Sequence, residues 1–189
     1  KYDGYIVYSN GGTPRKIIPG GCFSARFRPD AQQVGYILGS FGSPSASGKL
    51  EFWSIDIDGK NPQRGFVDSI SRTGGSMAFS YSPDGMKIAW LRTFPERYQE
   101  IIIHDLESGV ERAITSDKKN IDELVWVRED QIIYTTNKSG IFNIYKVCVD
   151  GGEPMQITNW IESAFGVKAS TDGQKIVSCQ QRMFADFWI

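Results

Sequence analysis

The chain has 189 residues, 40% of them hydrophobic and 13% aromatic, so it is long and apolar enough to bury a sizeable core. Its formal net charge of −1 argues against a general nucleic-acid or anionic-membrane binder, because such proteins need an excess of basic residues. No apolar run approaches the roughly 18 residues that cross a bilayer, and the first residues do not resemble a signal peptide. We therefore expect either a mature or excised segment or targeting that is encoded elsewhere.

The first predicted elements are two short strands, residues 4–8 and 14–18, joined by a glycine-rich turn. Strand-like runs rich in Ile, Val, Phe, Tyr and Trp then continue to the end of the chain, and none shows a helical period. They group into four-stranded units. We predict one domain, residues 1–189, made of a partial unit at 1–20, complete units at about 21–66, 76–115 and 121–158, and a partial unit at 163–189.

Two kinds of turn signal recur out of phase and define these units. Markers of the first kind recur at intervals of about 43 to 54 residues, which indicates a structural repeat rather than a catalytic motif. Two interleaved turns per period imply two hairpins, hence four strands, in each unit. The first kind comprises Phe27-Arg28-Pro29-Asp30, Tyr81-Ser82-Pro83-Asp84-Gly85, Trp126-Val127-Arg128-Glu129 and Ala169-Ser170-Thr171-Asp172-Gly173, and the second Asn10-Gly11-Gly12, Asp56-Ile57-Asp58-Gly59, Asp105-Leu106-Glu107-Ser108-Gly109 and Asp150-Gly151-Gly152.

The motifs at residues 82–89 and 150–158, Ser-Pro-Asp-Gly-x-Lys-Ile-Ala and Asp-Gly-Gly-Glu-Pro-x-Gln-Ile-Thr, resemble the WD40-like (PD40) repeat of TolB-type β-propellers. The resemblance covers essentially the whole chain and implies an all-β fold of four-stranded antiparallel blades around an axis, usually six to eight of them. Two departures, Ala31 in place of glycine and Arg128-Glu129-Asp130 in place of Pro-Asp-Gly, predict distorted hairpins in the first and third units.

About four blades' worth of strands are present, so we expect a piece of a larger propeller. Two alternatives remain open. The N-terminal strands could complete the C-terminal ones in a closed four-bladed ring, or two chains could pair as half-rings in a homodimer, because exposed sheet edges invite association.

The sequence offers little for catalysis or metal binding. A single histidine, His104, follows three isoleucines in a predicted strand and is expected to be structural; one histidine cannot build a polyhistidine metal site. The acidic turn at residues 56–61 lacks the length and terminal glutamate of a calcium loop. Cys22, Cys148 and Cys179 have no metal-ligand spacing, and the last two are expected to be small buried hydrophobes. We predict no catalytic residue, cofactor or metal.

The binding hypothesis comes from topology. In an antiparallel blade the first-to-second and third-to-fourth strand turns share one face, and all other connections share the opposite face. The first face is acidic, whereas the long connections of the second carry more basic than acidic residues. Turn chemistry alone also favours aspartate, which explains the acidic face without any function. Recognition residues are predicted on the long-loop face because loops on a rigid scaffold carry binding: Arg92, Phe94, Arg97, Tyr98, Lys118, Lys119 and Trp160.

We therefore interpret the chain as a non-enzymatic recognition, scaffold or sensor module of a larger bacterial protein, binding a protein or peptide and neither nucleic acid nor the membrane interior. The resemblance implies a periplasmic or other extracytoplasmic location, with the cytoplasm as the alternative. The alternative function is the substrate-gating propeller of a prolyl-oligopeptidase-like serine peptidase whose catalytic domain lies outside this chain.

Overall fold

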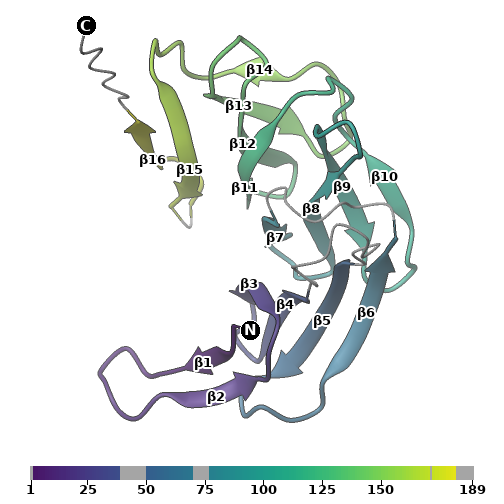
Figure 1. The fold of residues 1–189 in the computed structure, drawn as a ribbon, viewed down its shortest axis with the longest axis vertical. Coiled ribbons are helices and arrows are strands. Elements are labelled where there is room, and N and C mark those ends of the chain that lie inside the picture. The colour runs from purple at the N-terminus through teal and green to yellow at the C-terminus, as the bar shows by residue number, and fades with distance from the viewer. Residues whose placement is uncertain (1, 39–49, 70–76, 171, 182–189) are drawn as a thin grey trace, which may run out of the picture.

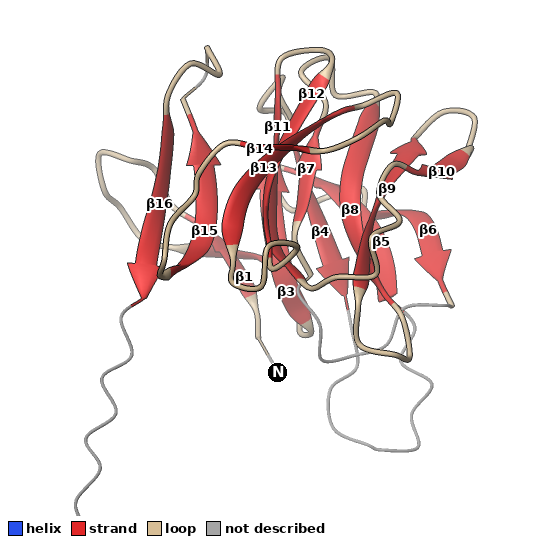
Figure 2. Ribbon diagram, turned by 90° about the horizontal axis from the view of Figure 1, so that it is seen from above, coloured by secondary structure: helices blue, strands red, loops and turns tan. Residues whose placement is uncertain are grey.

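The computed structural model describes residues 2–38, 50–69, 77–170 and 172–181, and the regular structure in these ranges is β-strand (Figure 2). Three four-stranded antiparallel sheets, β3–β6, β7–β10 and β11–β14, lie between two two-stranded sheets, β1–β2 and β15–β16. The strands are β1 (Gly4–Ile6), β2 (Arg15–Ile18), β3 (Cys22–Phe27), β4 (Gln33–Leu38), β5 (Leu50–Asp56), β6 (Gln63–Asp68), β7 (Phe79–Tyr81), β8 (Lys87–Thr93), β9 (Gln99–Asp105), β10 (Glu111–Ala113), β11 (Ile121–Val127), β12 (Gln131–Thr136), β13 (Asn143–Cys148), β14 (Met155–Gln156), β15 (Ser163–Ala169) and β16 (Ile176–Gln181).

Each four-stranded sheet is a propeller blade whose strands follow one another in chain order. The second strands, β4, β8 and β12, are buried on both faces, which explains why they read as continuous apolar runs rather than as an alternating pattern. The fourth strands, β6, β10 and β14, are mostly exposed. The predicted all-β fold of four-stranded antiparallel blades is confirmed.

Four hydrophobic clusters hold neighbouring sheets together, one at each boundary. Ile18 and Tyr36 belong to the cluster between β1–β2 and β3–β6, and Phe52 and Trp90 to the next. Leu124 lies in the cluster between β7–β10 and β11–β14, and Val167 in the last. The core is therefore distributed along the repeat, so each blade is stabilised mainly by its neighbours.

The sheets follow one another around an arc, with β1–β2 at one end and β15–β16 at the other (Figure 1). Within the described residues β1 pairs only with β2, and β16 only with β15. The alternative of a closed four-bladed ring is therefore wrong for this structure, because the two half-blades form separate sheets. Pairing of two chains stays a prediction.

The hairpins between first and second strands test the two departures from the repeat. In the first unit the Ala31 N–H donates to Arg28 O at 2.8 Å, as the Gly85 N–H does to Ser82 O in the second, so the turn is retained. Ala31 reaches this turn only by adopting a left-handed φ of 55°. The third hairpin does differ: Val127 pairs with Gln131, which leaves a shorter turn with Arg128 at φ 55°.

Two further predictions need correction. Cys148 and Cys179 are exposed rather than buried, because Cys148 ends β13 and Cys179 lies in β16, whose sheet is packed on one side only among the described residues. The long connection expected at 66–75 begins later, since β6 continues to Asp68. The remainder of that connection up to residue 76, and the predicted loop at 40–49, lie outside the described residues except for position 69.

Candidate protein-recognition surface

The connection between β8 and β9 is a tight turn that presents two aromatic side chains. The Arg97 N–H donates to Phe94 O at 2.9 Å, and the Phe94 N–H donates to Tyr98 O at 2.9 Å. The Phe94 and Tyr98 rings stack with centroids 4.7 Å apart and planes 11° from parallel. Arg97 itself adopts a φ of 65° at the tip of the turn. The backbone bonds and the ring stack fix this turn before any partner arrives, which lowers the entropy cost of binding.

The connection between β10 and β11 lies beside this turn and contributes lysines. The Gln99 N–H donates to Lys119 O at 3.0 Å, and Gln99 Oε1 accepts from the Ile121 N–H at 2.9 Å, so the two connections are joined by hydrogen bonds. Lys118 Nζ lies 6.0 Å from the centroid of the Tyr98 ring, within the range of a cation–π contact. The Asn120 N–H donates to Asn137 Oδ1, which links a third connection, between β12 and β13.

These three connections surround an open depression of about 380 Å³. We call it the recognition depression; it is lined by Glu96, Arg97, Tyr98, Lys118, Lys119, Asn120 and Asn137. Arg97, Lys118 and Lys119 form no ion pair with a carboxylate in the described part of the chain. Desolvation, with Glu100 and Glu96 nearby, raises the pKa of Tyr98, so its hydroxyl is protonated at neutral pH. The depression thus offers cationic groups beside an aromatic ring.

Five of the seven predicted recognition residues lie close together. Arg97, Tyr98, Lys118 and Lys119 line one depression, and Phe94 lies directly behind Tyr98. The sequence reasoning missed Asn120 and Asn137, whose only signal was their position at the ends of two neighbouring connections. That these residues bind a partner stays a prediction.

Arg92 lies elsewhere, in β8 rather than in the following loop. Its side chain is 13% exposed, with Nη2 2.7 Å from Glu111 Oε2 and Nε 3.3 Å from Asp68 Oδ1. The guanidinium also stacks over Trp90 at 4.9 Å from the ring centroid. Because Asp68 belongs to the preceding blade, Arg92 joins two blades and is placed for a structural role.

Trp160 is half-buried at the boundary between β11–β14 and β15–β16, away from the recognition depression. Its N–H donates to Asn143 Oδ1 at 2.8 Å, and its carbonyl accepts from Asn143 Nδ2 at 3.3 Å. The indole packs against a cluster that includes Ile144 and Val167. Its surroundings are those of a packing residue.

The acidic turns of the opposite face are explained by local hydrogen bonding. Asp84 Oδ1 accepts from Ser82 Oγ at 2.5 Å and from the Met86 N–H at 2.9 Å, and these bonds lower the pKa of Asp84. Asp172 repeats the arrangement with Ser170 and the Gln174 N–H, with the same effect on its pKa. Side chains that hydrogen-bond two residues ahead favour such turns. The acidity of this face therefore follows from turn chemistry.

The single histidine of the chain is held in packing contacts. His104 is 6% exposed in β9; its ring stacks on Phe66 at 4.2 Å and its Nδ1 lies 3.0 Å from Glu111 Oε1. Among the described residues no three His, Cys, Asp or Glu side chains gather as metal ligands. In the same ranges no helix is long and apolar enough to cross a membrane.

The sequence from Phe52 to residue 184 matches the family profile of the dipeptidyl peptidase IV (DPP IV) N-terminal region. The chain belongs to this family. The match covers most of the repeat, including all of the recognition depression. A comparison with curated protein sequences gives no significant match.

Solved structures confirm the propeller fold. TolB from Acinetobacter baumannii superposes with a TM-score of 0.78 at 21% identity over 94% of this chain and 42% of that one. A TolB described as putative, from Agrobacterium tumefaciens, gives 0.75 at 19% identity over 94% and 62%. A puromycin-hydrolysing peptidase from Mycobacterium tuberculosis gives 0.68 at 18% identity over 89% and 30%. The chain thus spans less than two thirds of each relative, and the likeness to TolB-type propellers is one of fold.

Proposed function

We propose that this propeller module recognises an acidic segment of a partner protein through the recognition depression. The observation that carries the proposal is the juxtaposition of Arg97, Lys118 and Lys119 around Tyr98 without an ion-pair partner in the described residues. Arginine and aromatic side chains supply much of the binding energy in protein interfaces, and unpaired cations favour a partner of opposite charge. No group in the depression is arranged for catalysis, so binding is the activity that we assign to it.

A glutamate-rich decapeptide provides the direct test, with a lysine-rich decapeptide as the matched probe of opposite charge. We expect fluorescence anisotropy to detect binding of the acidic peptide only, weakening as salt screens the charges. The double variant Arg97→Ala/Tyr98→Ala should weaken binding about tenfold or more while the melting temperature stays unchanged. Lys60→Glu, on the opposite face, is the control and should bind normally. Equal binding of both peptides, or loss of folding in the double variant, would contradict the proposal.

A second candidate function follows from the family itself. The profile match to the DPP IV N-terminal region, and the fold similarity to puromycin-hydrolysing peptidases, favour a propeller that controls substrate access in a serine peptidase. Catalysis would then belong to another domain of the parent protein. Sequencing the parent gene beyond the codon of Ile189 decides between the candidates: an α/β-hydrolase sequence with its Ser, Asp and His would establish the peptidase, and its absence would favour the recognition module.

We also propose that two chains associate through their half-blades. The edges of β1 and β16 each have a single strand neighbour in the described residues, and unpaired edges form hydrogen bonds with other strands. Light scattering on the 21.2 kDa chain should then report a dimer. A monodisperse monomer would contradict this association.

By analogy with bacterial TolB propellers we expect an extracytoplasmic location, which fractionation of expressing cells tests.

A further inference from the structure

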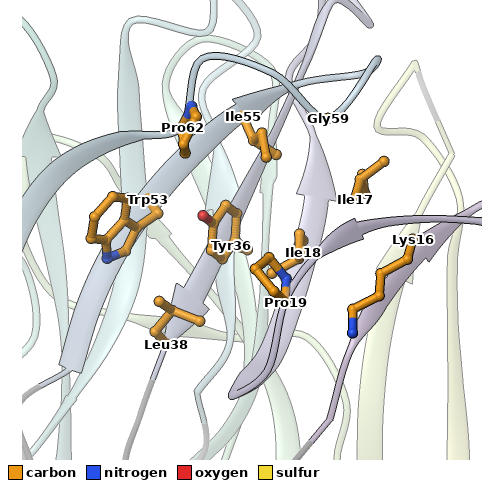
Figure 3. A pocket seen from close by; sticks show the side chains of 10 residues that line it. All are labelled: Lys16, Ile17, Ile18, Pro19, Tyr36, Leu38, Trp53, Ile55, Gly59 and Pro62. Atoms are coloured by element: carbon orange, nitrogen blue, oxygen red, sulfur yellow. The ribbon is translucent and has the colours of Figure 1, made fainter.

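A hollow of about 570 Å³ lies between β1–β2 and β3–β6, on the opposite side of the latter sheet from the second blade (Figure 3). Most of its lining is apolar. Ile17 and Ile18 come from β2, Tyr36 and Leu38 from β4, and Trp53 and Ile55 from β5, with Lys16, Pro19, Gly59 and Pro62 completing the lining. Small-molecule sites are typically concave, mostly apolar and about 300 to 1,000 Å³ in volume, so this hollow has the size of a ligand site.

The Tyr36 hydroxyl is a polar group in the lining of the hollow. Tyr36 is 3% exposed, and its hydroxyl has no hydrogen bond to any described residue. Figure 3 shows the hydroxyl on the side of the ring that faces Trp53 and Pro62. Burial, with a smaller effect of Cys22, raises the pKa of Tyr36, so the group is a neutral donor and acceptor at physiological pH. A few polar groups in a mostly apolar site commonly orient its ligand, and this hydroxyl is suited to that role.

The other polar groups around the hollow are already paired. Lys16 Nζ lies 2.7 Å from Asp3 Oδ2, which neutralises the cation in the lining. Trp53 Nε1 donates to Glu51 Oε2 at 2.8 Å. A charged ligand would therefore meet no free counter-charge among these residues, whereas a neutral ligand could use the Tyr36 hydroxyl.

Comparison with the next blade boundary explains why the hollow exists. There Phe66 of β6 occupies the position that Ile18 holds in β2, because Phe66 pairs with Phe52 and Ile18 with Gly4 just beyond the same irregularity of the ladder. The Phe66 ring stacks on His104 and lies 5.3 Å from Trp90, which corresponds to Tyr36 by its place in the second strand. The smaller Ile18 carries no ring into this space, and β1–β2 has two strands where β3–β6 has four, so the space stays open.

We propose that this hollow binds a neutral, largely apolar small molecule with one hydrogen-bonding group, which pairs with the Tyr36 hydroxyl. Apolar contacts with Trp53, Ile55 and Leu38 would supply most of the affinity, and Tyr36 would orient the ligand. This site is separate from the recognition depression, which is built from the second and third blades.

Indole is a suitable probe because it is neutral and aromatic and has one N–H donor; toluene is the matched probe without that group. The 189-residue chain, labelled at isoleucine δ1 methyls, is titrated with each probe and followed by NMR. We expect shifts of Ile17, Ile18 and Ile55, while Ile102 and Ile132 at other boundaries stay unchanged. No shift up to the solubility of indole, or equal shifts at all five methyls, would overturn the proposal.

Two variants test the roles of shape and hydroxyl separately. Ile18→Phe places a ring where Phe66 lies in the next boundary and should abolish binding of both probes without lowering the melting temperature. Tyr36→Phe should weaken indole about three- to tenfold, the value of one hydrogen bond, and leave toluene unchanged. If Ile18→Phe fails to fold, Leu38→Trp fills the hollow from its other side. Normal indole binding in a folded, filled variant would overturn the proposal, as would normal binding by Tyr36→Phe.

Discussion

The two faces of the β3–β6 sheet meet their neighbours in different ways although the strands involved are equivalent repeats. Toward β7–β10, Phe66 stacks on His104, and Arg92 forms ion pairs with Asp68 and Glu111. Toward β1–β2, a sheet of two strands, Ile18 takes the place of Phe66 and a hollow remains. Repetition of the backbone therefore does not produce repetition of the core, because the side chains and strands that meet differ from one boundary to the next.

The ion pairs of the filled boundary should give the largest effect. Replacement of Arg92 by Ala leaves Asp68, whose side chain is 2% exposed, without this counter-charge, and we expect the free energy of unfolding to fall by about 3 to 5 kcal/mol. Urea denaturation measures it. Lys138→Ala removes more exposed ion pairs and should cost less than about 1 kcal/mol. Equal losses in both variants would show that Arg92 does not join the blades.

Replacement of Phe66 by isoleucine should open a hollow at the boundary between β3–β6 and β7–β10. Phe66→Ile removes the ring between His104 and Trp90, and we expect a loss of about 1 to 2 kcal/mol together with a new cavity. Thermal unfolding reports the loss, and a crystal structure reports the cavity. The reverse change, Ile18→Phe, should cost less, because its ring enters space that is already open. A neutral Phe66→Ile variant would mean that neighbouring residues collapse into the space.

The turn position occupied by Ala31 in the first blade is occupied by Gly85 in the second. Ala31→Gly removes the cost of a left-handed alanine and should raise the free energy of unfolding by about 0.5 to 1 kcal/mol, less than the full penalty because glycine orders a freer chain. Gly85→Ala should be destabilising, because its φ is 70° and the new Cβ would lie 3.0 Å from Arg28 Nε. Chemical denaturation of both variants checks the opposite signs.

Acid should weaken the filled boundary by a smaller amount. Burial acts to raise the pKa of Glu111, but hydrogen bonds from Arg92 and His104 outweigh it and leave the pKa lowered. A carboxyl with a lowered folded-state pKa contributes stability above its unfolded value, near 4.5, and loses it as the pH falls through the folded value. Glu111→Gln should therefore flatten the decline of unfolding free energy below about pH 4.5. Glu129→Gln, in an exposed turn, is the control and should leave the profile unchanged.

The recognition depression shows how far sequence reasoning reached. Its loops could be located because the turn markers fix the order of the strands, and the order fixes which connections share a face. Arg97 and Lys118 were predicted on one face in this way, and they line the same depression. Arg92 was predicted at the junction of strand and loop, whereas its ion pair with Asp68 joins residues from different blades and has no local sequence signal.

The sequence by itself determined the strands, the hairpins and the repeat, because these depend on local turn chemistry and on apolar runs of strand length. Only the tertiary structure decided which side chains of different blades meet. The filled space around Phe66 and the hollow beside Tyr36 both depend on the distance between sheets that are joined by packing rather than by local sequence. Exposure of Cys148 and Cys179 has the same origin, since a strand can be recognised from its residues, but its burial depends on what lies against it.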